Sequence, residues 1–361
     1  MRIQSIDYLR GLMSLSIVIY HFSLSFTNWG FSDSNTLLGR LGIYAVTAFY
    51  IISGMALYLA HRADKWSSSQ YGIFIARRFL RLAPVYWVAL IAFTVFYCGF
   101  VNGFTFDKWR YVQNIFLLFG ITNPTKYMIM GGWSIGNEVV FYLFFPIFIV
   151  MVKNRMLASV LLVLSVLLLL YCSFFMINPS VTLARQWATY INPLNQVYYF
   201  IFGILAAKWF LPLVGTNKKI CISLALLLFL IFILYPASGN QAIIIHGITK
   251  LVFSMITLGL CVLFFLMQNL QNIKPLHTIL YFLGNVSYPL YLLHGVSFLY
   301  FRKWFFSAEM DNQQLIISGL ILLLVLLVLS WLCHIGIEKP VIRLSKCLSN
   351  NKGQHTINTS T

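Results

Sequence analysis

Two ionisable side chains, Arg10 and His21, lie eleven positions apart inside the first apolar stretch of the chain. Eleven residues make about three helical turns, so both side chains share one helix face, roughly 16 Å apart along the axis. Because charges are costly in hydrocarbon, such groups are expected to face a protein interior or a wet cavity. We interpret His21 as a general base and Arg10 as the partner of an anion or dipole. A snorkelling arginine and a hydrogen-bonded core histidine are the alternative.

A basic cluster directly precedes a later apolar stretch and consists of Arg77, Arg78 and Arg81. On a helix, the spacings of three and four residues to Arg81 bring the guanidinium groups together. Arginine forms bidentate hydrogen bonds to phosphate, so the cluster predicts a site for a phosphorylated ligand. Ordinary cytoplasmic anchoring or the binding of lipid head groups is the alternative interpretation.

A carboxylate, Glu138, lies near the beginning of another apolar stretch, shortly after Trp133 and Ser134. It lies about five residues from the outer end of its predicted span, which is also the depth of His21 in its own span. A carboxylate beside a histidine raises the basicity of the imidazole and fixes its tautomer, so we expect the two to pair if their helices touch. A glutamate bonded at an interfacial helix cap is the structural alternative.

Two further ionisable residues occupy the last apolar stretches. His294 falls in the outer half of the membrane and, taken alone, is more typical of a core histidine. Glu338 lies at the inner end of the last stretch, in the same layer as Arg10 and the arginine cluster. We expect Glu338 to neutralise one of these arginines rather than to act in catalysis.

The predicted positions form two layers in the membrane. The cytoplasmic layer is basic and suits a polyphosphate, whereas the outer layer contains His21 and Glu138 and suits proton transfer. A substrate with an anionic head and a long neutral arm would connect the layers, and coenzyme A thioesters have that shape. Their acyl carbon is activated and needs only an alcohol that a base has made nucleophilic.

The composition identifies the class of protein that carries these residues. Of 361 residues, 60% are hydrophobic and 9% are charged, whereas a soluble domain has about 25% charged residues. The apolar runs are continuous and as long as helices, which excludes a β-barrel and predicts an all-α polytopic membrane protein. Cytoplasmic loops explain the net charge of +17 better than nucleic acid does, and a cytoplasmic anionic ligand is a second contributor. The cysteines show no paired spacing, so we expect neither a disulfide framework nor a metal site.

We predict about ten transmembrane helices, at residues 8–26, 38–60, 79–101, 133–152, 156–177, 194–213, 220–236, 247–268, 279–301 and 314–336. With both termini inside, 17 of the 25 Lys and Arg residues lie on the cytoplasmic side. This bias favours the N-in/C-in orientation. Residues 1–345 then form the transmembrane domain, and residues 346–361 form a polar cytoplasmic tail that we expect to be disordered.

The longest predicted loop is the outer segment, residues 102–132. Loops of this length are often functional. It contains three aromatic residues and a glycine pair that predicts a hinge, namely Trp109, Tyr111, Tyr127 and Gly131-Gly132. We expect the aromatic rings to stack on the faces of sugars. By contrast, the basic inner segment 61–78 is predicted to be a loop that runs straight into the third span.

Six short segments follow one another along the chain: residues 7–11 with His21, 49–54, 77–87, 133–138, 287–294 and 338–340. In this order they resemble the acyltransferase-3 family of membrane acyltransferases. No single segment is specific, but the ordered set spans nearly the whole chain. Since the chain ends soon after the last predicted span, we expect it to lack the extracytoplasmic SGNH-type domain that some relatives carry.

The resemblance implies O-acylation, usually acetylation, of extracytoplasmic glycans in the bacterial inner membrane. The implied donor is acetyl-CoA or another acyl-CoA, and we expect no permanently bound cofactor. The expected acceptor is a surface polysaccharide or lipid-linked sugar, such as a lipopolysaccharide O-antigen or a capsule unit. The remaining expected partners are membrane lipids, and nucleic acid is not among them. The resemblance implies that His21 is catalytic, that Glu138 lies in the active site, and that Arg10, Arg77, Arg78 and Arg81 handle the donor. We further expect Glu138 to be catalytic and Tyr86, Trp133, Ser134 and His294 to contact substrate.

Other functions stay open at this point. A flippase or exporter of a glycan or lipid-linked sugar would share the spans and the polar residues, but would not depend on acyl-CoA. Such a transporter would fit better with broken helices in two related halves, which the sequence does not show. The acceptor could also be a small molecule, a lipid or a peptide terminus. The transfer could be direct or pass through an acyl-protein intermediate.

Overall fold

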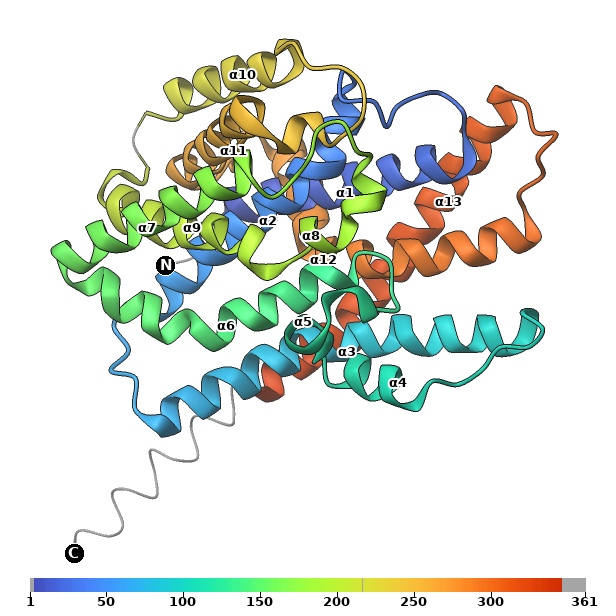
Figure 1. The fold of residues 1–361 in the computed structure, drawn as a ribbon, viewed down its shortest axis with the longest axis horizontal. Helices are drawn as coiled ribbons and strands as arrows, with labels where there is room; N and C mark the ends of the chain where they lie inside the picture. The colour runs from blue at the N-terminus through green and yellow to red at the C-terminus, as the bar shows by residue number, and fades with distance from the viewer. Residues whose placement is uncertain (1–2, 216, 346–361) are drawn as a thin grey trace, which may run out of the picture. The chain divides into compact units, whose positions relative to one another are not determined.

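The computed structural model describes residues 3–215 and 217–345, and every regular element in these ranges is helical (Figure 1). The chain divides into two compact units. The first unit comprises Met1–Arg62 and Ile147–Ser287, and the second comprises Ala63–Pro146 and Tyr288–Thr361. The prediction of an all-α protein is confirmed for the described residues. The predicted tail, residues 346–361, lies outside them.

Seven helices of the described residues are long and apolar enough to cross a membrane. They are α1 (Gln4–Phe26), α2 (Leu37–His61), α3 (Ser68–Phe100), α6 (Gly132–Lys153), α7 (Arg155–Phe174), α11 (Gly247–Met267) and the segment Asn312–Ser345, which begins with α13 (Asn312–Cys333). The chain is therefore a multi-pass membrane protein.

The remaining three predicted spans also coincide with helices, but these differ from the others. Helices α9 (Val197–Phe210) and α10 (Lys218–Leu234) have only 14 and 17 residues. Helix α12 (Lys274–Trp304) is long enough, but polar residues such as Asn285 and His294 interrupt its apolar sequence. The count of ten spans and the N-in/C-in orientation therefore stay predictions.

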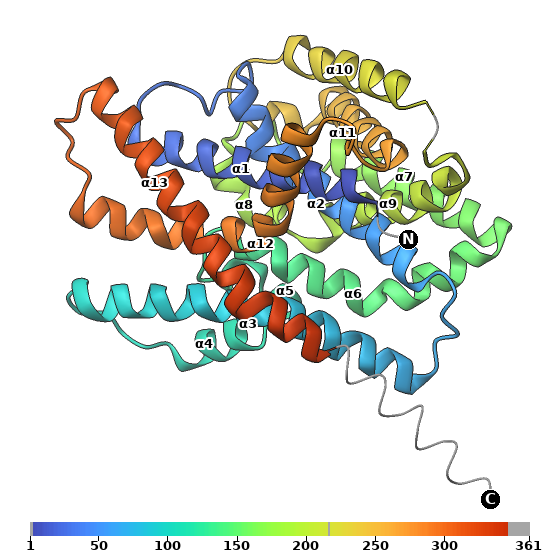
Figure 2. The same ribbon diagram turned by 180° about the vertical axis from the view of Figure 1, so that it is seen from behind.

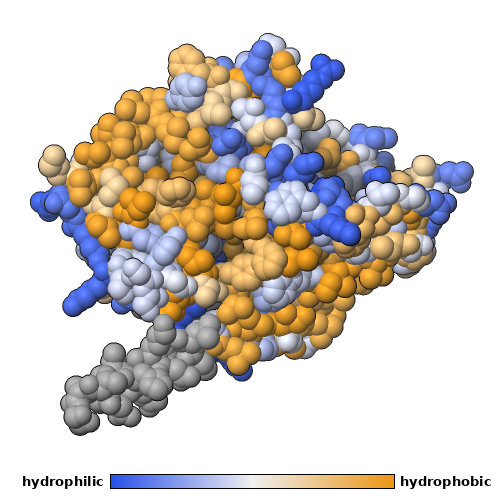
Figure 3. Space-filling model, turned by 60° about the horizontal axis from the view of Figure 1, so that its bottom comes forward, coloured by the Kyte–Doolittle hydropathy of each residue, from blue (hydrophilic) through white to orange (hydrophobic). Residues whose placement is uncertain are grey.

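Apolar side chains cover much of the visible surface (Figure 3). On α13, for example, Leu320, Leu324 and Val328 are all more than half exposed. In water such a surface would cause aggregation. It is the surface that a helix presents to lipid.

The first unit is organised around α2, which packs against α1, α9 and α11. Two glycines let α2 and α9 approach closely. A Cβ atom on Gly54 would lie 2.1 Å from the Phe200 carbonyl oxygen, and one on Gly203 would lie 2.0 Å from the Ile51 carbonyl oxygen. Small residues at such crossings are typical of membrane helices, because van der Waals packing drives their association.

A buried arginine fixes the end of α10 in the first unit. Arg40 is 2% exposed and donates to five carbonyl oxygens, those of Ser34, Phe232, Ile233, Tyr235 and Ala237, at 2.6–3.4 Å. Four of these carbonyls lie at or just after the C-terminus of α10, where backbone acceptors lack helical partners. In the predicted N-in/C-in orientation, Arg40 is one of the eight basic residues on the outer side. Its structural role is to cap a helix.

In the second unit, α3 begins eleven residues before the predicted span. Ser67 and Gln70 form a capping box, in which each side chain bonds the backbone N–H of the other. The prediction that residues 61–78 form a loop is therefore wrong for most of that segment. As a consequence, the arginine cluster lies within a continuous helix, which fixes the spacing of its side chains.

The second unit also contains the predicted outer segment and a π-helical turn. The outer segment folds into α4 (Lys108–Ile115), α5 (Phe119–Thr122) and a 3₁₀ turn, η1 (Pro124–Lys126). The π-helix η6 (His334–Glu338) follows α13 directly, near the end of the red ribbon in Figure 2. Short π-helical turns are rare in proteins, but those that occur are often found at functional sites.

Candidate active site

Arg10 forms an ion pair with Asp7, three residues earlier in α1. The Nη1 atom of Arg10 lies 3.1 Å from Oδ1 of Asp7, and both side chains are largely buried. The spacing places both groups on one face of α1. Asp7 therefore supplies a counter-charge to Arg10, a role that the sequence interpretation gave to no residue of this helix.

His21 is half-buried in α1 and contacts the ring of its neighbour Tyr20, with the ring centroids 5.1 Å apart. Hydrogen bonds through Gln241 fix the Tyr20 side chain in the first unit. Its hydroxyl donates to Oε1 of Gln241 at 3.0 Å, and Nε2 of Gln241 donates to the Gly39 carbonyl at 2.7 Å. Tyr20 therefore helps to position the predicted base, a role that no sequence pattern indicated.

Glu138 of the second unit accepts a hydrogen bond from the hydroxyl of Tyr142, at 2.8 Å. The ring of Tyr142 also carries the guanidinium of Arg78, whose Cζ lies 6.0 Å from the ring centroid. Tyr142 thus connects two of the predicted site residues, one from α6 and one from α3. The sequence interpretation did not include Tyr142, although it lies one helical turn after Glu138.

Arg78 is the member of the arginine cluster that the structure leaves best placed for a ligand. Its guanidinium lies over two rings, those of Phe74 (5.7 Å) and Tyr142. Its Nε atom is buried and has no hydrogen-bond partner among residues 3–215 and 217–345. A buried donor of this kind is rare and requires an explanation, such as a ligand or water at the site. Arg77 differs, because its Nε donates to the Ser345 carbonyl at 3.1 Å.

Ser134 and His294 are both bonded to Tyr291 in the second unit. The Ser134 hydroxyl lies 2.9 Å from the Tyr291 hydroxyl, and the Nδ1–H of His294 donates to the Tyr291 carbonyl at 2.6 Å. The Tyr291 hydroxyl also donates to the Gly131 carbonyl at 3.1 Å. Gly131 has a positive φ of 79°, and a Cβ atom there would lie 2.8 Å from this ring. Trp133, beside Ser134, is buried.

Tyr86, predicted to contact substrate, anchors the outer segment. Its buried hydroxyl donates to Oδ1 of Asn114 at 2.5 Å, and the same oxygen accepts from the Met128 backbone N–H at 2.9 Å. The amide nitrogen of Asn114 donates to the Arg110 and Lys126 carbonyls. Asn114 therefore ties α4, η1 and α3 together, and the contact of Tyr86 with substrate stays a prediction.

The aromatic residues of the outer segment differ in exposure. Trp109 is 62% exposed, whereas Tyr111 is 6% exposed. Tyr111 stacks on Phe106, with the centroids 3.8 Å apart, and its hydroxyl bonds to Thr94 at 2.9 Å. Of these two, only Trp109 presents its ring for stacking on a sugar. The expectation is wrong for Tyr111, because its ring is used in packing.

Glu338 pairs with a histidine of its own π-helical turn. Its Oε2 atom lies 2.7 Å from Nδ1 of His334, four residues earlier, and Glu338 is 8% exposed. No sequence pattern indicated a role for His334. The expected neutralisation of an arginine by Glu338 stays a prediction.

The predicted site residues are divided between the two units. The first unit contains Arg10 and His21, and the second contains the other eight, namely Arg77, Arg78, Arg81, Tyr86, Trp133, Ser134, Glu138 and His294. Within the second unit, the structure links Glu138 with Arg78 and Ser134 with His294, each pair through a tyrosine. The pairing of His21 with Glu138 stays a prediction.

The chain is similar to two named O-acetyltransferases. It is 26% identical over 329 residues to the peptidoglycan O-acetyltransferase OatA of Listeria monocytogenes, an alignment that covers 81% of this chain and 49% of the relative. It is 24% identical over 381 residues to the O-acetyltransferase OatA of Staphylococcus aureus, covering 97% and 59%, respectively. The chain thus spans about half the length of the curated relatives it matches.

A family comparison also matches nearly the whole chain. Residues 3–335 match the family model described as an acyltransferase domain. This range contains both units' predicted site residues, the Glu138–Tyr142 bond and the cluster around Tyr291. The predicted resemblance is confirmed, and the chain belongs to the acyltransferase-3 family.

Proposed function

We propose that the protein transfers an acyl group, and specifically acetyl, from cytoplasmic acyl-CoA to a hydroxyl of a glycan at the outer side of the bacterial plasma membrane. The observation that carries the proposal is the family match over residues 3–335. The names of the two relatives, both O-acetyltransferases, support acetyl as the group and oxygen as its acceptor.

The second unit supports an anionic donor. Arg78 has a buried Nε donor without a partner among the described residues, and Arg77 and Arg81 lie near enough on α3 to add to its positive field. Arginine suits the phosphates of coenzyme A because its planar fork forms paired hydrogen bonds. The rings of Phe74 and Tyr142 hold the Arg78 guanidinium in place, so less side-chain freedom is lost on binding.

In the proposed reaction, His21 takes the proton from the acceptor hydroxyl while the oxygen attacks the thioester carbonyl carbon. A C–O bond forms, the C–S bond breaks, and the coenzyme A thiolate leaves and is protonated. Glu138 supports the proton transfer as the second catalytic group, and the bond from Tyr142 orients its carboxylate. A route through an acyl-protein intermediate would divide the transfer into two steps. A protein side chain would first attack the thioester and displace coenzyme A, and the acceptor hydroxyl would then attack the acyl-protein and release that side chain.

The name of the Listeria relative favours peptidoglycan as the first acceptor to test, ahead of O-antigen or capsule units. The exposed ring of Trp109 gives the outer segment a surface on which a sugar can stack. Trp133, Ser134 and His294, which are buried, are the residues we assign to the deeper part of the acceptor path.

The test is NMR and mass spectrometry of the cell-wall and surface glycans from three host strains: wild type, a deletion, and the deletion complemented with His21→Ala. Ester signals that vanish in both mutants, while the glycan still reaches the surface, support acyl transfer. Loss of the glycan itself would instead support an exporter. Full ester signals with His21→Ala would reject His21 as the base.

A further inference from the structure

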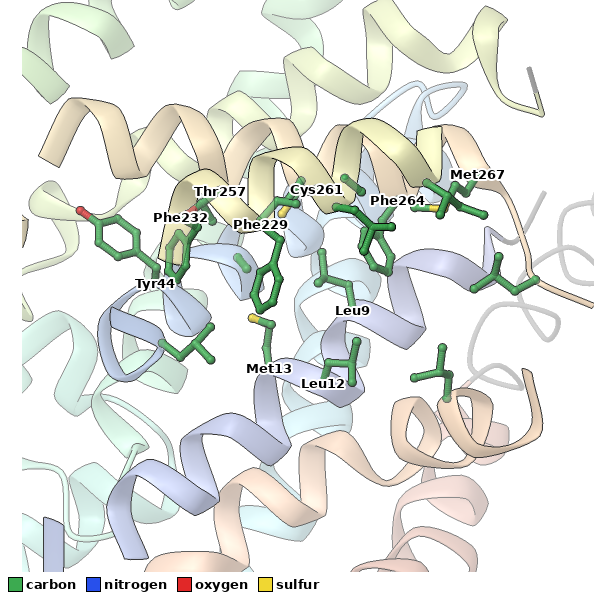
Figure 4. A pocket seen from close by; sticks show the side chains of 18 of the residues that line it. Leu9, Leu12, Met13, Tyr44, Phe229, Phe232, Thr257, Cys261, Phe264 and Met267 are labelled. Carbon is green, nitrogen blue, oxygen red and sulfur yellow. The ribbon is translucent and has the colours of Figure 1, made fainter. Parts of the chain in front are cut away.

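An apolar cavity of about 380 Å³ lies inside the first unit, and none of the predicted site residues is among its lining residues. Side chains from α1, α2, α10, α11 and the beginning of α12 line it (Figure 4). Leu9 and Met13 of α1 point across the cavity towards Phe229 and Phe264. For comparison, an engineered apolar cavity of about 150 Å³ stays dry and binds benzene.

The cavity offers a ligand almost no polar contact. Among its described lining residues, hydroxyl groups belong only to Tyr44 and Thr257, and both are already bonded to backbone. The Tyr44 hydroxyl donates to the Ile244 carbonyl at 2.5 Å, and the Thr257 hydroxyl donates to the Phe253 carbonyl at 2.8 Å. Water would find too few partners here, so a hydrocarbon chain is the occupant that fits.

The rim of the cavity is part of the apolar surface. Four of the lining residues are at least 36% exposed, namely Leu226 and Phe229 of α10, Leu276 of α12 and Ile273 just before it. In a membrane these side chains face lipid tails. A tail can therefore enter the cavity sideways without passing through water.

Three lysines stand at one end of this cavity. Lys218 and Lys219 begin α10, one turn before the lining residue Ile222, and Lys274 begins α12 between the lining residues Ile273 and Leu276. Lys219 and Lys274 are exposed. The Lys218 ammonium donates one of its three N–H groups to Oδ1 of Asn269 at 3.1 Å, which holds it beside the C-terminus of α11.

The sequence around these lysines contains no acidic residue that could neutralise their positive charge. No Asp or Glu occurs between Glu138 and Glu309, and Asp7 of α1 is paired with Arg10. An anionic head group is therefore the complement of this end of the cavity. The predicted orientation places the lysines on the cytoplasmic side, where anionic lipids attract basic residues.

We propose that this cavity binds one acyl tail of an anionic glycerophospholipid, with its phosphate held by Lys218, Lys219 and Lys274. The site is independent of the proposed acyl transfer, since it uses none of the residues assigned to that reaction. The bound lipid fills the space between α1, α10 and α11, and so stabilises the first unit.

The test uses the purified full chain in detergent, with native mass spectrometry of bound lipid and thermal unfolding as readouts. The probes are dioleoyl phosphatidylglycerol and dioleoyl phosphatidylcholine, which have the same tails. We expect phosphatidylglycerol to bind about tenfold more tightly or better, and to raise the unfolding temperature more. Replacing all three lysines by glutamine should remove this preference. The affinity for phosphatidylglycerol should fall more than that for phosphatidylcholine, because the choline cation of phosphatidylcholine offsets the charge of its phosphate.

Binding of the lipid acyl tail is tested by placing a larger side chain at the rim of the cavity. Leu226→Trp should weaken the binding of both lipids, whereas Leu227→Trp, its neighbour outside the cavity, should bind as wild type. Leu276→Trp repeats the test from α12 in case the first variant folds poorly. A phosphatidylglycerol with a photoreactive tail should label cavity residues such as Met13 and Cys261.

Three results would overturn the proposal. Wild-type affinity in both tryptophan variants would show that the tail lies elsewhere, and an unchanged preference in the lysine variant would place the head group elsewhere. Tighter binding of a polyprenyl phosphate than of phosphatidylglycerol would assign the site to a different lipid.

Discussion

The hydroxyl of Tyr142 donates to Oε2 of Glu138 at 2.8 Å, across one turn of α6. The same ring carries the Arg78 guanidinium on its face. The side chain of Tyr142 therefore contacts a predicted catalytic carboxylate through its hydroxyl and a predicted donor-binding arginine through the face of its ring. The two functions of Tyr142 can be separated by substitution, because only one of them needs the hydroxyl.

We expect Tyr142→Phe to lower kcat by about tenfold, because a hydrogen bond to a charged group contributes roughly 1.5–3 kcal/mol. The KM for acyl-CoA should change little, since the ring still supports Arg78. Tyr142→Leu should lower kcat and also raise that KM. Steady-state acetyl transfer with both variants is the measurement. Identical kinetics for Phe and Leu would show that the ring has no part in donor binding.

Arg78→Met should raise the KM for acyl-CoA by about 10–100-fold, because it removes charge-assisted hydrogen bonds to phosphate. Arg77→Met should have a smaller effect, because Nε of Arg77 is already bonded to the Ser345 carbonyl. The measurement is acyl-CoA titration of both variants at saturating acceptor. A larger effect at Arg77 than at Arg78 would contradict this ranking.

His21→Ala should lower acyl transfer by at least about 100-fold, the usual contribution of a general base. The variant should fold normally, because His21 is only half-buried. His246→Gln is the matched control, since the Nδ1 of His246 is bonded to the Ile177 carbonyl at 2.8 Å and has no assigned catalytic role. Ester content of the glycan and membrane abundance of the protein are measured together. Equal losses in both variants would indicate a structural effect.

Asn114→Ala should destabilise the second unit by roughly 2 kcal/mol, since side-chain hydrogen bonds in membrane proteins average about 0.6 kcal/mol and Asn114 makes four. Tyr86→Phe removes one of these bonds and should have a smaller effect. Val112→Ala, on the exposed face of α4, is the control. Thermal unfolding of the purified chain gives the ranking, and a larger effect of Val112→Ala would refute it.

Gly54→Ala should destabilise the first unit by about 1–3 kcal/mol, because the added methyl group would overlap the Phe200 carbonyl. Gly72→Ala, in α3, should be neutral or stabilising by up to about 1 kcal/mol, since nothing lies within 4 Å of its Cβ position. Unfolding temperatures in detergent provide the comparison. Equal shifts would mean that the α2–α9 crossing relaxes without strain.

Long apolar runs made the helices predictable, since α2, α6 and α11 begin and end within a few residues of the expected spans. The beginning of α3 was missed because its first turns are polar and charged, so their composition is typical of a loop. The sequence nevertheless marks the beginning of this helix, because Ser67 and Gln70 have the spacing of a capping box.

Some of the site residues could also have been predicted from the sequence, whereas others could not. Asp7 and Tyr142 lie three and four residues from Arg10 and Glu138, so helical spacing alone could have identified both. Tyr291 could not be found in this way, because it bonds to Ser134 across 157 residues of sequence. Contacts of that kind depend on how helices pack, and a single sequence carries no periodicity that reports them.

Arg40 is bound by backbone carbonyls, and carbonyls do not titrate. A carboxylate partner would be protonated in acid and would then release the guanidinium. Exposed ion pairs also weaken in concentrated salt, whereas this buried cap is shielded from ions. The junction between α2 and α10 is therefore indifferent to acidity and ionic strength. Such insensitivity to pH and salt suits a protein whose predicted outer side is exposed to the medium outside the cell.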